Sequence, residues 1–375
     1  MSRSKYLRGV HWFLKLILIL SALLALWFMV AYLLPQVLPT VRVINSQKYG
    51  IIVQNERWGG EVNVIGDIWA LPGTTVTIDP GTHIRVARDS DKSNLHFLPW
   101  AFRSGLNTGE DWFGVRNGEL FWDEGQKIQI RLSRVYGIGT PQQPIRLYSA
   151  ASPHSPYDFN IFSVESGVLS YWELSHYRRM LIGTEVTVRD SVFTDIAECA
   201  VCIEYKNPTI INNVFRSSLR DHIFIIGASP KITDNIFFQP SPGGSAILLD
   251  PQVVGNPQIS HNDFELLFQP AIKVVTGSEQ RGGEVDFNNF GGNSLIEIPC
   301  DSKLKFSNNQ IRGTVKMSHS GNCVGKLIFG PNYWFSIDKE VILKEKFMNK
   351  ELQFIIEIPE LLTKIPKSGR RMGRY

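Results

Sequence analysis

The sequence is poor in cysteine and lacks the residue groupings that mark many enzyme sites. Its 375 residues include four cysteines, and no Cys/His quartet has the spacing of a zinc site. A glycine-rich phosphate loop, a dinucleotide-binding motif and a Ser-His-Asp order are also missing. We therefore expect no metal and no cofactor, and no common nucleophilic enzyme class is indicated.

Acidic residues are missing from the N-terminal segment, where the first is Glu56. Arg3, Lys5, Arg8 and Lys15 carry a formal charge of +4, which equals the net charge of the whole chain. The residues after Lys15 therefore balance to zero. Because a nucleic-acid-binding domain normally carries a basic patch, we expect no nucleic-acid partner.

An apolar run without charges, Leu16–Leu34, follows these basic residues over 19 positions. Such a run spans the hydrocarbon layer of roughly 30 Å as a helix, and the positive-inside rule places the N-terminus in the cytoplasm. A cleaved signal peptide is the alternative, but the run is long for one and no small-x-small site follows it. We expect a single-pass protein at the cell membrane with four successive parts: a cytoplasmic tail (1–15), a transmembrane helix (16–34), a connector (35–54) and an extracytoplasmic remainder.

One short phrase recurs through the second half of the chain. Its six copies are Val188–Phe193, Ile210–Phe215, Ile232–Phe237, Ile259–Phe264, Val285–Phe290 and Phe306–Ile311. Their last residues are 22, 22, 27, 26 and 21 positions apart. Each copy starts with an apolar residue and ends with Phe or Ile. A repeat of this length built from strand-like phrases is typical of a solenoid, in which stacked coils share one core.

An asparagine stands two positions before the end of five copies. These residues are Asn213, Asn235, Asn262, Asn288 and Asn309. Stacking in register places equivalent residues about 4.8 Å apart, so each amide can donate to the next and accept from the previous one. The pattern predicts an amide ladder along the solenoid.

Three motifs resemble those of bacterial extracytoplasmic right-handed parallel β-helix proteins with a pectin-lyase-like solenoid. They are the I-x-x-N-x-F phrase, the segment Trp58–Val86 with its two Pro-Gly turns, and Gly330–Phe335 (GPNYWF). The resemblance implies an all-β, right-handed parallel β-helix over 55–335, and a cap with a short helix and a basic tail over 336–375. An ordinary β-sandwich is the alternative fold, and six aligned copies argue against it.

Residues 87–126 interrupt the repeat as an insertion that is rich in aromatic residues. Trp100, Trp112 and Trp122 offer faces for stacking on sugar rings, because long loops on rigid scaffolds often carry binding function. They equally fit a small hydrophobic cluster against the solenoid. Both interpretations stay open.

The best candidate for catalysis is the column three positions before each phrase end, which holds Asp190, Asp234 and His261. Parallel β-helix lyases and hydrolases use clustered acids on neighbouring coils, but a solvated polar turn fits this column as well. Two functions follow. The first is a non-catalytic module that binds glycan or has a structural or interaction role, with cell-surface polysaccharide as the expected partner. The second is a polysaccharide lyase or glycoside hydrolase.

The cysteines fall into two pairs. Cys300 and Cys323 are 23 residues apart, about one coil, so stacking brings them within range of a disulfide. Cys199 and Cys202 are three apart on an expected strand and should point to opposite faces. We therefore expect them to be small core residues or a strained bond rather than a redox site.

Overall fold

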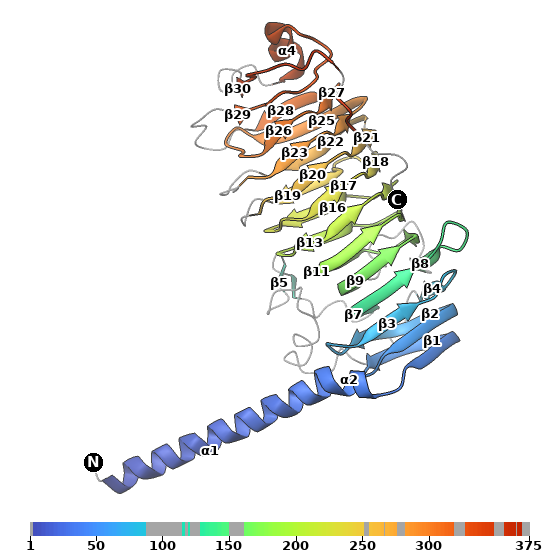
Figure 1. Ribbon diagram of the computed structural model, residues 1–375, viewed down its shortest axis with the longest axis vertical. Helices are drawn as coiled ribbons and strands as arrows, with labels where there is room; N and C mark the ends of the chain where they lie inside the picture. The colour runs from blue at the N-terminus through green and yellow to red at the C-terminus, as the bar shows by residue number, and fades with distance from the viewer. Residues whose placement is uncertain are drawn as a thin grey trace.

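The protein is an elongated solenoid with a helix projecting from its N-terminal end (Figure 1). The computed structural model describes residues 3–87, 115–116, 119–120, 128–149, 161–250, 255–265, 267–275, 282–318, 327–348, 356–364 and 366–369. Parallel strands wind round the solenoid and hydrogen-bond coil to coil in one 26-stranded sheet. The predicted all-β parallel solenoid is confirmed.

The register divides this sheet into three faces. Five long strands cross two or three faces: β1 (Val41–Ile52), β2 (Glu56–Ala70), β7 (Gln129–Ile138), β9 (Ile161–Ser170) and β11 (Arg179–Arg189). The first face also holds β3 (Thr75–Ile78), β14 (Thr209–Ile211), β17 (Lys231–Thr233), β20 (Gln258–Ser260), β23 (Glu284–Asp286) and β26 (Lys305–Ser307).

The second face holds β4 (His83–Val86), β8 (Ile145–Ser149), β10 (Trp172–Ser175), β12 (Val192–Thr194), β15 (Val214–Phe215), β18 (Ile236–Phe238), β21 (Asp263–Glu265), β24 (Asn289–Phe290) and β27 (Gln310–Ile311). The third face holds β13 (Cys199–Glu204), β16 (Asp221–Ile226), β19 (Ile247–Asp250), β22 (Leu267–Val274), β25 (Asn293–Pro299) and β28 (Thr314–Ser318). Two small pairs, β5 (Val115–Arg116) with β6 (Glu119–Leu120) and β29 (Leu327–Ile328) with β30 (Ile356–Glu357), lie outside the main sheet.

The core runs along the axis as files of like side chains. The phenylalanine that ends each phrase, from Phe193 to Phe290, is fully buried. Successive rings in this file stack with centroids 4.7, 4.8, 5.0 and 4.9 Å apart. This spacing equals the distance between neighbouring strands, so the repeat in the sequence becomes direct contact in space.

The solenoid begins one coil earlier than the sequence indicates. Within the expected connector (35–54), β1 pairs in parallel with β2 on all three faces. The pairing runs from Val41 with Glu56 to Ile52 with Ala70. Before it lie α1 (Arg3–Phe28), the π-helix η1 (Met29–Leu33) and α2 (Leu34–Val37). Within the described residues, none of the helices combines the length and hydropathy of a membrane span.

Aromatic side chains close the C-terminal end. Trp334, Phe329 and Phe347 are buried together, with ring centroids 5.3 to 5.6 Å apart. The short helix α4 (Lys339–Lys346) follows, and the Asp338 side chain caps it by accepting from the backbone N–H of Glu340 at 2.9 Å. The cap covers core and strand edges that an open end would expose.

Candidate functional site

The predicted asparagines lie in single file inside the solenoid, and all five are fully buried. In each step the backbone N–H and the Nδ2 of one asparagine donate to the Oδ1 of the next, at 2.9–3.1 Å. The file continues to Asn332, which accepts from Asn309 in the same way and which the repeat pattern did not include. At the other end, Ser191 donates its N–H to Asn213. The amides therefore hold the coils in register from within.

The residues immediately before this file in each phrase form a second column, and their backbone conformation explains their residue types. Asp190, Asn212, Asp234, His261, Phe287 and Asn308 all have positive φ, between 53° and 58°. This left-handed region is uncommon for residues other than glycine, and Asn, Asp and His are enriched there. The column is therefore a series of tight turns between the first and second faces, which explains its residue types without catalysis.

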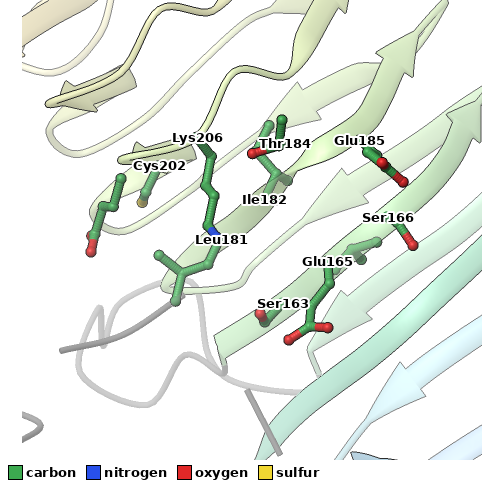
Figure 2. A pocket seen from close by; sticks show the side chains of 12 residues that line it. Ser163, Glu165, Ser166, Leu181, Ile182, Thr184, Glu185, Cys202 and Lys206 are labelled. Carbon is green, nitrogen blue, oxygen red and sulfur yellow. The ribbon is translucent and has the colours of Figure 1, made fainter. Parts of the chain in front are cut away.

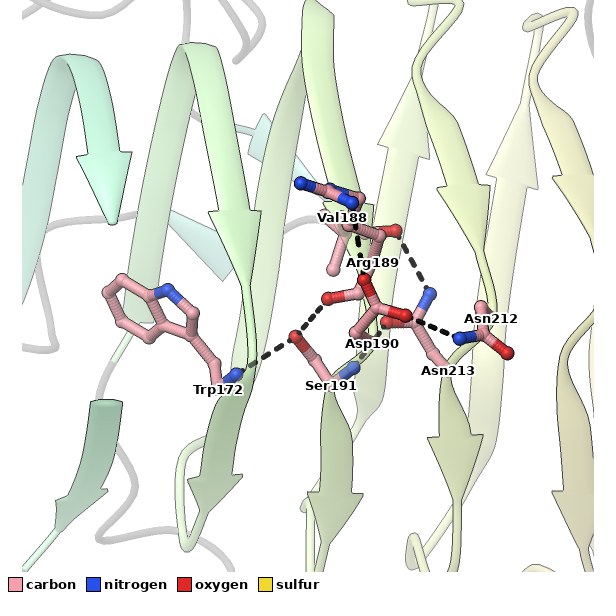
Figure 3. Close-up of polar contacts among 7 residues, drawn as sticks. All are labelled: Trp172, Val188, Arg189, Asp190, Ser191, Asn212 and Asn213. Carbon is pink, nitrogen blue, oxygen red and sulfur yellow. Dashed lines mark hydrogen bonds and ion pairs between the residues drawn. The ribbon is translucent and has the colours of Figure 1, made fainter. Parts of the chain in front are cut away.

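The contacts of Asp190 and Asp234 fit that structural role. The Nδ2 of Asn212 donates to the Asp190 carboxylate across one coil step, and Arg189 lies 3.5 Å from the same carboxylate (Figure 3). Asp234 is fully buried and accepts from the Thr233 hydroxyl at 3.2 Å. His261 stacks on Phe287 with ring centroids 5.1 Å apart. The three candidates lie in one turn column, and none of them lines the cavity at the corner between the third and first faces.

A cavity opens at the corner between the third and first faces, beside β9, β11 and β13 (Figure 2). Its volume is about 290 Å³. Its polar lining comes from three successive coils: Ser163, Glu165, Ser166, Thr184, Glu185, Glu204 and Lys206. Lys206 extends from its coil toward Leu181 on the coil before it. Three carboxylates, one ammonium and three hydroxyls therefore share one hollow.

A glycine beside this hollow allows two coils to pack closely. Val164 pairs with Ile182, and Leu181 with Cys202. If both pairings are extended along the strands, Gly183 lies between Glu165 on the coil before it and Glu204 on the coil after it. A Cβ built on Gly183 would overlap the backbone carbonyl of Glu165, so the position has no room for a side chain.

A bulge beside the cavity corrects the expectation for the first cysteine pair. Cys199 and Cys202 form a disulfide with their Cα atoms 5.7 Å apart. Between their register partners, Arg179 and Leu181, β11 has one residue where β13 has two. Because of this extra residue, the adjacent Ala200 and Val201 both face the main core. Cys199 and Cys202 therefore point to the same side, into a separate small cluster. Cys202 lines the cavity.

Other predicted residues fall outside the described part of the chain. These are Trp100, Trp112 and Trp122 of the insertion, and Cys323. Cys300 is disulfide-bonded, and its pairing with Cys323 stays a prediction. Among the described residues, no three His, Cys, Asp or Glu side chains are grouped to hold a metal ion.

Three buried titratable groups do not line the cavity. Burial lowers the pKa of His222 from 6.5 to about 4, although its ring contacts the Phe238 carbonyl at 2.8 Å. Burial also raises the pKa of Asp221, while hydrogen bonds from Ser245 oppose that rise. The Tyr177 pKa lies well above its ordinary value because the hydroxyl is buried, where it donates to the Ala200 carbonyl. These groups are part of the buried interior and do not line the hollow.

Comparison with known proteins agrees with this architecture. Residues 179–327 match the family model of the right-handed β-helix region. No curated protein and no solved structure matches the chain significantly. The parallel register and this match define the class: the protein is a parallel β-helix solenoid.

Proposed function

We propose that the protein is a membrane-anchored, extracytoplasmic β-helix module that binds glycan without cleaving it. The observation that carries the proposal is the cavity beside β9, β11 and β13, with its carboxylates and hydroxyls on successive coils. Its volume of about 290 Å³ is near the lower end of small-ligand sites. A single sugar ring fits that scale.

The lining chemistry suits sugar hydroxyls. Carboxylates accept hydrogen bonds from them, and hydrogen bonds to ionised groups are about twice as strong as those between neutral groups. Glu185 is exposed, whereas Glu165, Glu204 and Lys206 are half-buried, so the site offers both accessible and partly desolvated groups. Strands hold the three glutamates, which limits the entropy lost on binding.

Binding of the full-length protein to an array of neutral, anionic and amino-sugar oligosaccharides tests this proposal. We expect Glu185→Gln and Glu204→Gln to weaken binding to any captured glycan at least ten-fold, about 1.4 kcal/mol. Glu173→Gln is the matched control, because Glu173 pairs with Arg146 on the second face and does not line the cavity. Equal binding by all three variants would rule out the cavity as the site.

The aromatic insertion is a separate candidate for the same ligand. Replacing Trp100, Trp112 and Trp122 together by alanine distinguishes the two. Loss of binding in the tryptophan variant alone assigns the glycan to the insertion. Loss in the glutamate variants alone assigns it to the cavity.

The membrane anchor rests on apolar side chains along α1 and η1 that face solvent. Trp12, Leu24 and Met29 are 76%, 68% and 56% exposed. Burying such surface in lipid stabilises by about 25 cal/mol per Å². We expect the full-length protein to stay in the membrane pellet after carbonate washing and to leave it with detergent. Release by carbonate alone would exclude an integral anchor.

A carbohydrate-active enzyme is the second candidate, and the carboxylate geometry of the cavity favours it. Glu165 and Glu204 are two coil steps apart, about 9.6 Å by strand spacing. This is close to the upper limit of about 9.5 Å for the two acids of an inverting glycosidase. Turnover of a polysaccharide that Glu165→Gln and Glu204→Gln each abolish would establish the enzyme. Binding without turnover supports the non-catalytic module.

A further inference from the structure

The C-terminal segment runs back along the outside of the solenoid. Leu361 bridges to Asn332, and the Leu362 N–H donates to the Asn332 carbonyl at 3.2 Å. Further on, the Ser368 hydroxyl lies 3.5 Å from Gln310 Oε1, and the Gly369 N–H donates to the Phe287 carbonyl at 2.7 Å. These three partners belong to successive coils, counted from the cap toward the middle. The segment thus crosses the coils in reverse order.

Close packing at Gly369 continues this path to the next coil. Gly369 is buried and has a φ of +83°, a left-handed conformation that glycine adopts without strain. A Cβ at this position would overlap the carboxylate of Asp263. The backbone therefore lies directly against Asp263 before the sequence enters its last six residues.

Two further aspartates lie on the coils ahead of Gly369. Asp234 follows one coil beyond Asp263, and Asp190 follows two coils beyond Asp234. Asp234 is fully buried although it occupies an outer turn, and the Asp190 side chain is only 5% exposed. The turn column therefore holds carboxylates with little access to water.

The length and charge of the remaining chain fit this surface. Four coil steps separate Phe287 from Asp190, about 19 Å at 4.8 Å per step. Six extended residues span about 20 Å. The six residues are RRMGRY, with Arg370, Arg371 and Arg374. The last six residues are therefore long enough to bring three cations to the coils that carry these three aspartates.

We propose that this turn column, with Asp263 beside it, is a docking surface for the basic C-terminal tail of the same chain. The tail completes a strap that extends from the cap to the middle of the solenoid and covers the corner between the first and second faces. The cavity opens at the corner between the third and first faces and stays uncovered. Because ion pairs hold the last six residues, salt weakens this contact.

Tryptic cleavage after Arg370 and Arg371 tests the proposal on the full-length protein, with loss of the C-terminal residues followed by mass. We expect cleavage to be about ten-fold slower at low salt than at about 0.5 M salt. Asp234→Asn combined with Asp263→Asn should remove the protection at low salt. Asp301→Asn is the control, because Asp301 is an exposed turn residue outside the column.

A second variant acts on the strap itself. Gly369→Ala should also expose the tail while the far-UV circular dichroism stays unchanged, since only the strap is displaced. Equal cleavage of the wild type and the double aspartate variant would overturn the proposal. Protection that disappears on dilution would also overturn it, because the tail would then dock on a second copy.

Discussion

Replacing Asn235 by leucine removes one rung from the middle of the asparagine file. Leucine keeps the branched shape of asparagine but is larger, so the change removes the hydrogen bonds and also crowds the site. Asn235 is fully buried, and its side chain takes part in five hydrogen bonds. Its Oδ1 accepts from the N–H and Nδ2 of Asn213, and its Nδ2 donates to the carbonyls of Ile210 and Thr233 and to Asn262 Oδ1.

The expected cost follows from what each partner loses. The Asn213 side chain still reaches the Val188 carbonyl, and Asn262 Oδ1 still accepts from the Asn235 N–H. The Asn213 backbone N–H loses its acceptor in a site without access to water. A buried donor left unsatisfied costs about 1–3 kcal/mol, and each other lost bond about 0.5–1.5 kcal/mol. We expect Asn235→Leu to lower the free energy of unfolding by about 3 kcal/mol.

Urea unfolding followed by circular dichroism measures this difference, with Asn63→Leu as the matched control. Asn63 is half-buried on β2, between the core residues Val62 and Val64, and faces outward. The control should change the free energy of unfolding by less than about 0.5 kcal/mol. If both variants are equally stable, the amides of the file contribute no net stability and the reasoning fails.

Three further predictions concern single features of the molecule. Since the His222 pKa is about 4 when folded against 6.5 for the ordinary side chain, its contribution to stability is complete above pH 6.5 and is lost as the pH falls toward 4. The loss is about 3 kcal/mol, and urea titrations across this range should show it for the wild type but not for His222→Gln. Gly183→Ala should lower the melting temperature and weaken glycan capture, because its methyl group meets the Glu165 backbone; unchanged melting would contradict that contact. Alkylation before and after reduction, with peptide mass mapping, should join Cys300 to Cys323, and a free thiol on Cys323 would refute the pairing.

The register of the coils was predictable because each inward-facing side chain meets two requirements. It must fit the core, and it must pack against the equivalent side chain on each neighbouring coil. The residue types at the positions of Asn235 and Phe237 therefore vary little from coil to coil. Asn332 escaped prediction because its phrase was interpreted only as the closing segment, and the ladder extends through it. The start of the solenoid was missed because β1 carries no copy of the phrase.

The candidate site was less predictable because one residue type serves two purposes. Asp190 and Asp234 suggested acid chemistry, but aspartate is also common where the backbone takes positive φ. Only the dihedral angles separate these explanations. The cavity lies beside Gly183 and the bulge in β13, both of which lie outside the repeated phrase. A bulge changes which side chains face inward, so a regular pattern cannot show it.

Cysteine crosslinking tests most directly whether coils stack in register. Thr209 and Lys231 are neighbours on adjacent coils, and Gln258 follows Lys231 on the next. Cysteines at Thr209 and Lys231 should lie about 4.8 Å apart, and those at Thr209 and Gln258 about 9.6 Å. A bifunctional bimane, which becomes fluorescent when it joins two thiols, should label the first pair rapidly and the second poorly. Equal labelling of both pairs, or of neither, would contradict the stacked solenoid.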